Sequence, residues 1–225
     1  MKSCCRGLEK QFGEHQAKRD LRRFRRRGAS RATRMLVDAI VDEGVAGATV
    51  LDIGGGVGAV QHLLLSQGAA RTLDVDVSHA YIESAREEGV RRGNAGRMAF
   101  QVGDFVDLAT ELEPSDIVTL DRVICCYPDM ERLVRESAGR AERLYGLVYP
   151  RSNAVSRLAV SAGNLLLRLW RSDFRAHVHD TQRVDELIRS LGFERRFHGA
   201  TIVWQVFLYG RTPSRERHGA GRTAA

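Results

Sequence analysis

Cysteine is scarce in this chain, and no apolar run approaches the ~20 residues that a membrane-spanning helix requires. The four cysteines form two adjacent pairs, Cys4 with Cys5 and Cys125 with Cys126, a spacing that excludes the disulfide framework of a small secreted scaffold. The CxxC spacing of a structural zinc site is also missing, so we expect no bound metal. Residues 1–16 lack the apolar core and cleavage site of a secretory signal. These absences predict a soluble, cytoplasmic protein with reduced thiols.

The charge is unevenly distributed along the chain. Of the formal net charge of +7, residues 1–34 carry +9, from twelve Lys or Arg against three acids. We predict a basic helical leader over residues 1–34 that could act as a lid, one folded domain over 35–211, and a disordered tail over 212–225, which has almost no apolar content. The leader could contact nucleic acid, an anionic membrane surface or an acidic substrate, or it could simply be a solvated face.

Short apolar runs alternate with helical patterns between residues 49 and 211, which is typical of a doubly wound, Rossmann-like α/β sheet. Five parallel strands are predicted at 49–53, 71–77, 98–103, 115–121 and 145–150. Crossover helices are predicted at 57–67, 78–93 and 128–144. The segment 181–211 is read as a helix and two strands, so we expect a mostly parallel sheet with an antiparallel C-terminal edge strand.

A glycine-rich turn, LDIGGGVG at residues 51–58, follows the first predicted strand and precedes its helix. Ligands bind at this edge of doubly wound sheets, and glycines let the backbone approach them closely. The turn alone is ambiguous, because Gly54, Gly56 and Ala59 also satisfy a dinucleotide-binding GxGxxA pattern. Asp52 weighs against a dinucleotide, since a carboxylate would repel a pyrophosphate and attract the ammonium group of a methionine moiety.

Two further acidic positions end the next strands. Asp76 follows the second strand, where a carboxylate can accept hydrogen bonds from ribose hydroxyls. Asp104 follows the third, within GDF, and would face an adenine amino group while Phe105 meets the adenine ring. The order LDIGGGVG, DVDVS and VGDF resembles the motif series of class I S-adenosylmethionine-dependent methyltransferases over residues 49–150.

The resemblance implies S-adenosyl-L-methionine as cofactor and assigns its contacts position by position. It places Asp52, Gly54, Gly56 and Gly58 around the amino-acid part, Asp76 at the ribose and Asp104 at the adenine. A structural alternative is an α/β domain whose glycines only make tight turns.

The second half of the chain resembles segments of magnesium-protoporphyrin IX O-methyltransferases at 118–129, 145–151 and 174–180. Those enzymes esterify a carboxylate, and the likeness implies an N-terminal helical leader that closes over the cofactor. The chain departs from that family at Cys126, where the family carries a histidine.

Candidate catalytic residues follow the fourth strand and lie in RAHVH. Asp121 could orient or deprotonate an acceptor or could cap a turn, and Tyr127 could hydrogen-bond the acceptor or form an aromatic wall. His177 and His179 would share one side of an extended segment and could serve as a base, or could be structural. Arg151 and Arg175 could bind an acceptor carboxylate, although arginine is abundant throughout the chain.

The sequence therefore predicts a methyltransferase that acts on a small-molecule acceptor, with O-methylation of a carboxylate or hydroxyl as the specific hypothesis. One alternative is an RNA methyltransferase that uses the basic leader, although the Asp/Asn-Pro-Pro-Tyr/Phe motif of base-amino methylation is missing. A non-catalytic cofactor-binding protein and a dinucleotide oxidoreductase are two more hypotheses that the residues allow. The acceptor, the methylated atom and the oligomeric state stay open.

Overall fold

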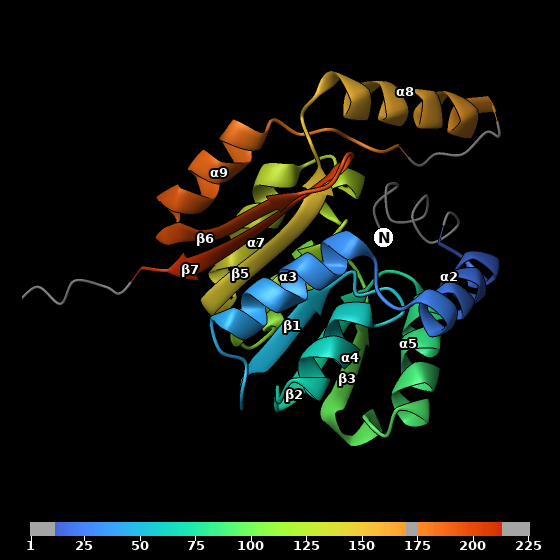
Figure 1. The fold of residues 1–225 in the computed structure, drawn as a ribbon, viewed down its shortest axis with the longest axis vertical. Coiled ribbons are helices and arrows are strands. Elements are labelled where there is room, and N and C mark those ends of the chain that lie inside the picture. The colour runs from blue at the N-terminus through green and yellow to red at the C-terminus, as the bar shows by residue number, and fades with distance from the viewer. Residues whose placement is uncertain (1–11, 170–174, 213–225) are drawn as a thin grey trace, which may run out of the picture.

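The computed structural model describes residues 12–169 and 175–212, which form one sheet covered by helices on both faces (Figure 1). The strands are β1 Thr49–Ile53, β2 Arg71–Asp76, β3 Met98–Val102, β4 Ser115–Asp121, β5 Ala141–Pro150, β6 Phe193–Ala200 and β7 Trp204–Arg211. The helices are α2 Glu14–Arg27, α3 Arg31–Asp42, α4 Ala59–Ser66, α5 His79–Arg91, α6 Phe105–Leu108, α7 Met130–Gly139, α8 Ala154–Leu169 and α9 Thr181–Ser190. Short 3₁₀ turns are η1 Ala95–Arg97, η2 Ala109–Glu111 and η3 Ile124–Cys126. The Cys4–Cys5 pair and residues 213–225 of the predicted tail lie outside the described residues.

The sheet has seven strands in the order β3-β2-β1-β4-β5-β7-β6. Strands β1 to β5 pair in parallel, whereas β7 pairs antiparallel with both β5 and β6. The predicted mostly parallel, doubly wound sheet with antiparallel C-terminal pairing is thereby confirmed. The antiparallel strand is β7, which lies second from the edge, and β6 forms the edge itself.

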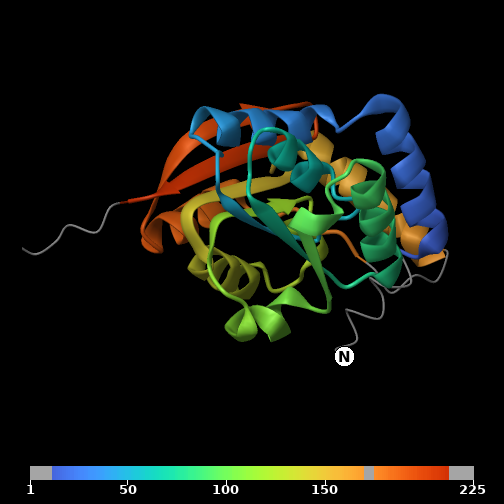
Figure 2. The same ribbon diagram turned by 90° about the horizontal axis from the view of Figure 1, so that it is seen from below.

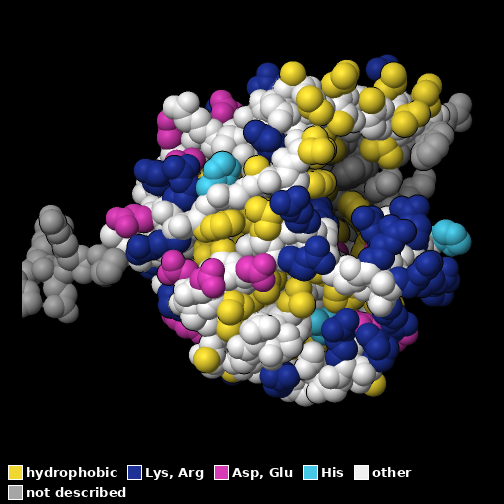
Figure 3. Space-filling model, in the orientation of Figure 1, with side chains coloured by type: hydrophobic (Ala, Val, Ile, Leu, Met, Phe, Trp, Pro, Cys, Tyr) yellow, Lys and Arg dark blue, Asp and Glu magenta, His cyan; other side chains and the backbone are white. Residues whose placement is uncertain are grey.

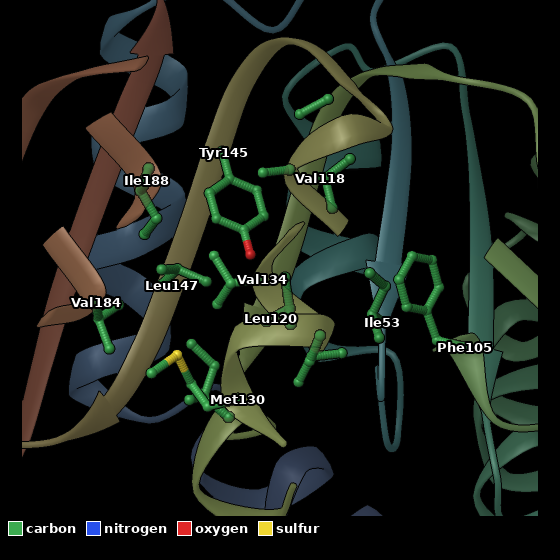
Figure 4. Close-up of a cluster of buried hydrophobic side chains, with 14 of the residues drawn as sticks. Ile53, Phe105, Val118, Leu120, Met130, Val134, Tyr145, Leu147, Val184 and Ile188 are labelled. Atoms are coloured by element: carbon green, nitrogen blue, oxygen red, sulfur yellow. The ribbon is translucent and has the colours of Figure 1, made fainter. Parts of the chain in front are cut away.

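Alternating side chains of the central strands divide the core into two layers. On one face Val118, Leu120 and Tyr145 pack with helices α7 and α9, as the close-up in Figure 4 shows. On the other face Ile117 and Leu144 pack with α3 and α4. Because side chains of one strand point to opposite faces in turn, the continuous apolar runs of β1, β4 and β5 fit a sheet that is buried on both sides.

The predicted helix over 128–144 is wrong at its C-terminal end. Helix α7 ends at Gly139, and Ala141 already begins strand β5. Leu144 pairs with Gly210 of β7 and is buried in the layer under α3. Pairing with two neighbouring strands therefore outweighs the helical propensity of this stretch.

The predicted leader divides into two parts with different roles. Helix α3 begins at Arg31, with the Ser30 side chain accepting a hydrogen bond from the Thr33 N–H, and its residues Leu36 and Ile40 are fully buried. The predicted boundary at residue 34 therefore falls inside a helix that covers the sheet. Helix α2 lies outside the sheet and packs on α5, where Asp20 accepts the Tyr81 hydroxyl and Arg25 pairs with Glu88 (Figure 2).

Within the described part of the chain, no helix combines the length and apolarity of a membrane span.

Candidate active site

The glycine turn links β1 to α4 and adopts a conformation that favours glycine at three positions. Gly54, Gly56 and Gly58 have φ values of 65°, 60° and 76°, in the left-handed region where a Cβ is disfavoured. The Gly54 N–H donates to the Val75 carbonyl at 2.8 Å, which fixes the turn against β2. The backbone of this turn is therefore fixed at the carboxyl edge of the sheet.

A buried polar cluster supports the turn from below. Asp52 is fully buried and accepts hydrogen bonds from Thr119 Oγ1 at 2.6 Å and Gln61 Nε2 at 3.1 Å. Asp74 is the register partner of Asp52 on β2 and accepts the Gly55 N–H at 3.1 Å. Burial raises the pKa of Asp52 to about 7 and raises that of Asp74 well above its ordinary value.

The same cluster explains why residue 55 is glycine. A Cβ at Gly55 would lie 2.4 Å from Gln61 Nε2 and 2.7 Å from carboxylate oxygens of both Asp52 and Asp74. Asp52 itself is not among the described residues that line the cavity above the turn. The structure therefore places Asp52, which the sequence predicts to contact an ammonium group, beneath the glycine turn.

Asp76 ends β2 inside the cavity. Its two carboxylate oxygens accept the backbone N–H of Ser78 at 2.8 Å and of Gly56 at 3.2 Å. Burial raises the pKa of Asp76, and these two hydrogen bonds oppose that shift. This carboxylate ties the glycine turn to the start of α5, whose first turn is capped by Ser78.

Asp104 and Phe105 lie at the end of β3, also at the cavity wall. The Asp104 carboxylate accepts the Val106 N–H at 3.0 Å and the Tyr127 hydroxyl at 3.1 Å. The predicted adenine-side and acceptor-side residues are thus brought into direct contact.

These residues border a cavity of about 810 Å³. Gly54, Gly55 and Gly56 line it from β1, Asp76 from β2, and Asp104 from β3. It is also lined by residues of α2, α3, the segment after β4, and Trp204 of β7. Of the predicted site residues, those that line the cavity are Gly54, Gly56, Asp76, Asp104, Phe105, Asp121 and Tyr127.

Asp121 ends β4 and contacts the leader directly. Its Oδ2 accepts a hydrogen bond from Thr33 Oγ1 at 2.6 Å, and its Oδ1 lies 3.6 Å from Arg122 Nε. Arg122 has a φ of 67°, the one positive φ at a non-glycine position among the described residues. Its guanidinium donates to Ser30 Oγ and to Thr33 Oγ1, and stacks 5.1 Å above the Trp204 ring. The strained backbone at Arg122 therefore aims this side chain at the N-terminus of α3.

Six arginines among the described residues line the cavity. They come from α2, α3 and the residue after β4, and they are Arg19, Arg23, Arg27, Arg31, Arg34 and Arg122. Figure 3 shows Lys and Arg side chains gathered over α2 on this face. Arg19, Arg23 and Arg27 are spaced four residues apart, so they lie along one side of the helix. The cavity lining thus combines the carboxylates at the ends of β2 and β3 with arginines from the leader.

The two histidines of RAHVH lie behind η3, and neither is among the described residues that line the cavity. The His177 N–H donates to the Cys125 carbonyl at 2.7 Å, and His179 Nε2 bonds to the Ile124 carbonyl at 3.0 Å. Their rings stack with centroids 5.9 Å apart. Burial lowers the pKa of His179, so its imidazole is neutral near pH 7. These contacts hold the segment after β4 in place.

The remaining candidates serve other contacts. Arg151 donates its backbone N–H to the Val203 carbonyl at 2.8 Å, and neither Arg151 nor Arg175 lines the cavity. The Sγ atoms of Cys125 and Cys126 lie 3.9 Å apart. Across residues 12–169 and 175–212, no three His, Cys, Asp or Glu side chains gather in a way that could hold a metal ion.

Sequence reasoning did not find Gly55, Asp74, Gln61, Thr33 or Arg122. Asp74 carries a detectable signal, because an acid inside a buried parallel strand needs partners, and the strand pattern sets it beside Asp52. The contacts of Thr33 and Arg122 depend on how α3 crosses the sheet, which local patterns do not report.

Comparisons with known proteins agree with this geometry. Residues 51–141 match the family described as Methyltransferase domain, while a search of curated protein sequences finds no match. Magnesium protoporphyrin IX methyltransferase from Synechocystis PCC 6803, solved with bound SAH, superposes with a TM-score of 0.66 at 20% identity, over 80% of this chain and 82% of that chain. Two further solved structures share the fold at lower identity.

An O-methyltransferase family 2 protein from Planctomyces limnophilus DSM 3776, in complex with apigenin, gives a TM-score of 0.65 at 16% identity, over 87% of this chain and 62% of that chain. A protein described as a putative RNA methyltransferase from Pyrococcus horikoshii gives 0.60 at 14% identity, over 82% and 83%. The predicted fold and its resemblance are confirmed. Residues 51–141 are similar to the methyltransferase domain family, and the chain has the fold of the class I S-adenosylmethionine-dependent methyltransferases.

Proposed function

We propose that this protein is an S-adenosylmethionine-dependent methyltransferase that acts on an anionic small molecule. The methyl group goes to an oxygen atom of a carboxylate or hydroxyl group. The observation that carries the proposal is the cavity of about 810 Å³ that joins the glycine turn and two strand-end carboxylates to an arginine-lined wall. The strand-end carboxylates suit the cofactor, and the arginines suit an anionic acceptor.

The cavity-lining residues fit the cofactor. Gly54, Gly55 and Gly56 present backbone with no side chain between it and the cavity. Asp76 would accept hydrogen bonds from the ribose hydroxyls, and Asp104 would accept them from the adenine amino group. Phe105 supplies an apolar surface beside Asp104. When bound, the cofactor supplies an electrophilic methyl group on a positively charged sulfur.

The chain's own contribution is to align the acceptor and exclude water. Methyl transfer is an in-line displacement, so positioning and a dry pocket supply much of the rate, and an ionised carboxylate acceptor needs no base. For a hydroxyl acceptor, Asp121 would orient the hydroxyl and accept its proton, because this carboxylate lines the cavity. Tyr127 is fixed by its hydrogen bond to Asp104 and would form the wall beside the acceptor.

The arginines supply the preference for an anion. Side chains four residues apart along α2 line the cavity, where several guanidinium groups raise the local concentration of an anionic acceptor. A guanidinium also binds a carboxylate through two parallel hydrogen bonds.

The test measures transfer of a labelled methyl group from S-adenosylmethionine to a panel of carboxylic acids and phenols, each paired with its methylated or neutral analogue. We expect transfer to anionic members, and Arg23→Gln and Arg27→Gln should raise KM for them by about tenfold each. Arg189→Gln is the control, because Arg189 pairs with Asp185 on α9. Methyl transfer to added RNA, with no transfer to any small acceptor, would favour the RNA methyltransferase alternative. Cofactor binding without any transfer would favour a non-catalytic binding protein.

A further inference from the structure

Helix α8 carries an apolar face that the described parts of the molecule leave uncovered. Five of the eight large hydrophobic side chains that are exposed among the described residues lie on this helix. They are Val155 (58% exposed), Leu158 (73%), Leu165 (59%), Leu166 (53%) and Leu169 (69%). With 3.6 residues per turn, these positions fall within one stripe along a single side of the helix.

The opposite side of α8 is the one that attaches to the protein. Ser156 is buried and donates to the Val203 carbonyl, and Asn164 exchanges two hydrogen bonds of 2.8 Å with the backbone of Ala176. The helix is therefore oriented by polar contacts on its inner side. Its leucines are turned outward by the same geometry, and Figure 3 shows apolar side chains along α8 at the surface.

The charge around this stripe favours an anionic partner. Helix α8 carries Arg157 and Arg168 and no Asp or Glu. These arginines are about three helical turns apart, so both lie on one side of the helix, between the apolar stripe and the attached side. Figures 1 and 2 place α8 at the same end of the molecule as the arginine-rich helix α2.

We propose that α8 docks this protein onto an anionic lipid bilayer, with its leucine stripe in the acyl boundary and Arg157 and Arg168 among the headgroups. A helix with an apolar stripe and flanking arginines binds a membrane surface through buried apolar area together with attraction to anionic lipids. Such a helix lies in the interface and does not span it. The inference does not depend on the proposed methyl transfer.

The size of the stripe favours lipid over a second copy of the chain. Complete burial of a leucine corresponds to roughly 60–120 Å² of apolar surface, so five half-exposed side chains present on the order of 300 Å². Two copies that met along α8 alone would bury on the order of 600 Å², about half of what a specific interface needs. A lipid surface needs no such complementary area.

Vesicle flotation of the full chain tests the proposal. We expect the protein to float with vesicles of phosphatidylcholine mixed with phosphatidylglycerol, and much less with phosphatidylcholine alone. The triple variant Leu158→Gln, Leu165→Gln and Leu169→Gln should bind the anionic vesicles at least about tenfold more weakly, with an unchanged melting temperature. Arg157→Gln with Arg168→Gln should weaken binding by a similar factor and reduce its dependence on salt.

Val90→Gln is the matched control, because Val90 is 65% exposed on α5, far along the chain from α8. Flotation of the triple variant equal to that of the wild type would overturn the proposal. So would a loss of flotation in the Val90→Gln control equal to that in the triple variant. If the wild type is a dimer, the triple variant is a monomer and neither protein floats, the proposal is overturned in favour of a second copy of the chain.

Discussion

The hydroxyl of Thr33 donates a hydrogen bond of 2.6 Å to the carboxylate of Asp121, and so joins the first turn of α3 to the end of β4. Both residues line the cavity. Thr33→Val removes the hydroxyl and leaves the partly buried Oδ2 of Asp121 without its donor. The free energy of unfolding should fall by ~1–3 kcal/mol, measured by urea denaturation. Thr33→Ser keeps the hydroxyl and should lose much less, whereas an equal loss in both variants would show that the hydrogen bond to Asp121 does not account for the loss.

Helix α2 forms a wall of the cavity without being part of the sheet, so its removal should separate activity from folding. Deleting residues 1–28 leaves α3 and its Ser30 cap intact. We expect a cooperatively unfolding protein whose methyl transfer is largely lost, because the cavity opens to water. Deleting residues 1–34 also removes Ser30 and Thr33 and should lower the melting temperature further. Full activity in the shorter deletion would show that α2 does not close the site.

The carboxylate of Asp52 makes stability fall as the pH rises. Its pKa in the folded protein is about 7, against an ordinary value of 3.8, because it is buried. Between these pH values the folded protein keeps a proton that the unfolded chain has released, so raising the pH favours unfolding. Asp52→Asn removes this effect, and Gln61 Oε1, which accepts no hydrogen bond from the described residues, can receive the new amide after a flip of the Gln61 side chain.

The difference in unfolding free energy, variant minus wild type, should therefore grow by up to about 4 kcal/mol from pH 4 to pH 7. Asp116→Asn is a control of opposite sign, because hydrogen bonding by the Thr49 N–H lowers the pKa of Asp116. For Asp116 the stabilising contribution is lost as the pH falls. A pH-independent difference for Asp52→Asn would show that Asp52 is ionised in the folded protein.

His179 supports the segment after β4 and should not behave as a general base. Its Nε2 bonds to the Ile124 carbonyl, and its lowered pKa keeps it neutral near pH 7. His179→Ala should slow methyl transfer by less than the ~10² that loss of a general base costs, and should leave the midpoint of the pH–rate profile unchanged. His177→Ala keeps its backbone hydrogen bond to Cys125 and should have a smaller effect. A loss of ~10² or more in either variant, with a shifted pH profile, would restore the catalytic interpretation.

Local sequence patterns were sufficient to predict the order of strands and helices and the part of the candidate site that lies at the strand ends. The alternation of strands and helices, the glycine turn and the strand-end positions of Asp76 and Asp104 all follow from the order of residues along the chain. Those residues meet because parallel strands end at the same edge, so their proximity needs no tertiary information. The beginning of β5 at Ala141 was missed, because only its pairing with two neighbouring strands identifies it.

The acceptor side required the tertiary structure. The sequence offered His177 and His179 as candidate bases or structural residues, whereas the structure sets both behind η3 and brings α2 and α3 to the cavity. The leader was recognised by its charge, but the crossing of α3 over β5 and β7, which carries Thr33 to Asp121, is set by packing of Leu36 and Ile40.

Calorimetric titration of the full chain with S-adenosylhomocysteine tests the central claim most directly, with NAD⁺ as the competing ligand and Asp76→Ala as the variant. The account predicts binding of one S-adenosylhomocysteine per chain, no binding of NAD⁺, and an affinity for S-adenosylhomocysteine that is weaker by ~1–3 kcal/mol in Asp76→Ala, because ribose hydroxyls lose their acceptor. Binding of NAD⁺ in preference, or an unchanged affinity in a folded Asp76→Ala variant, would contradict it.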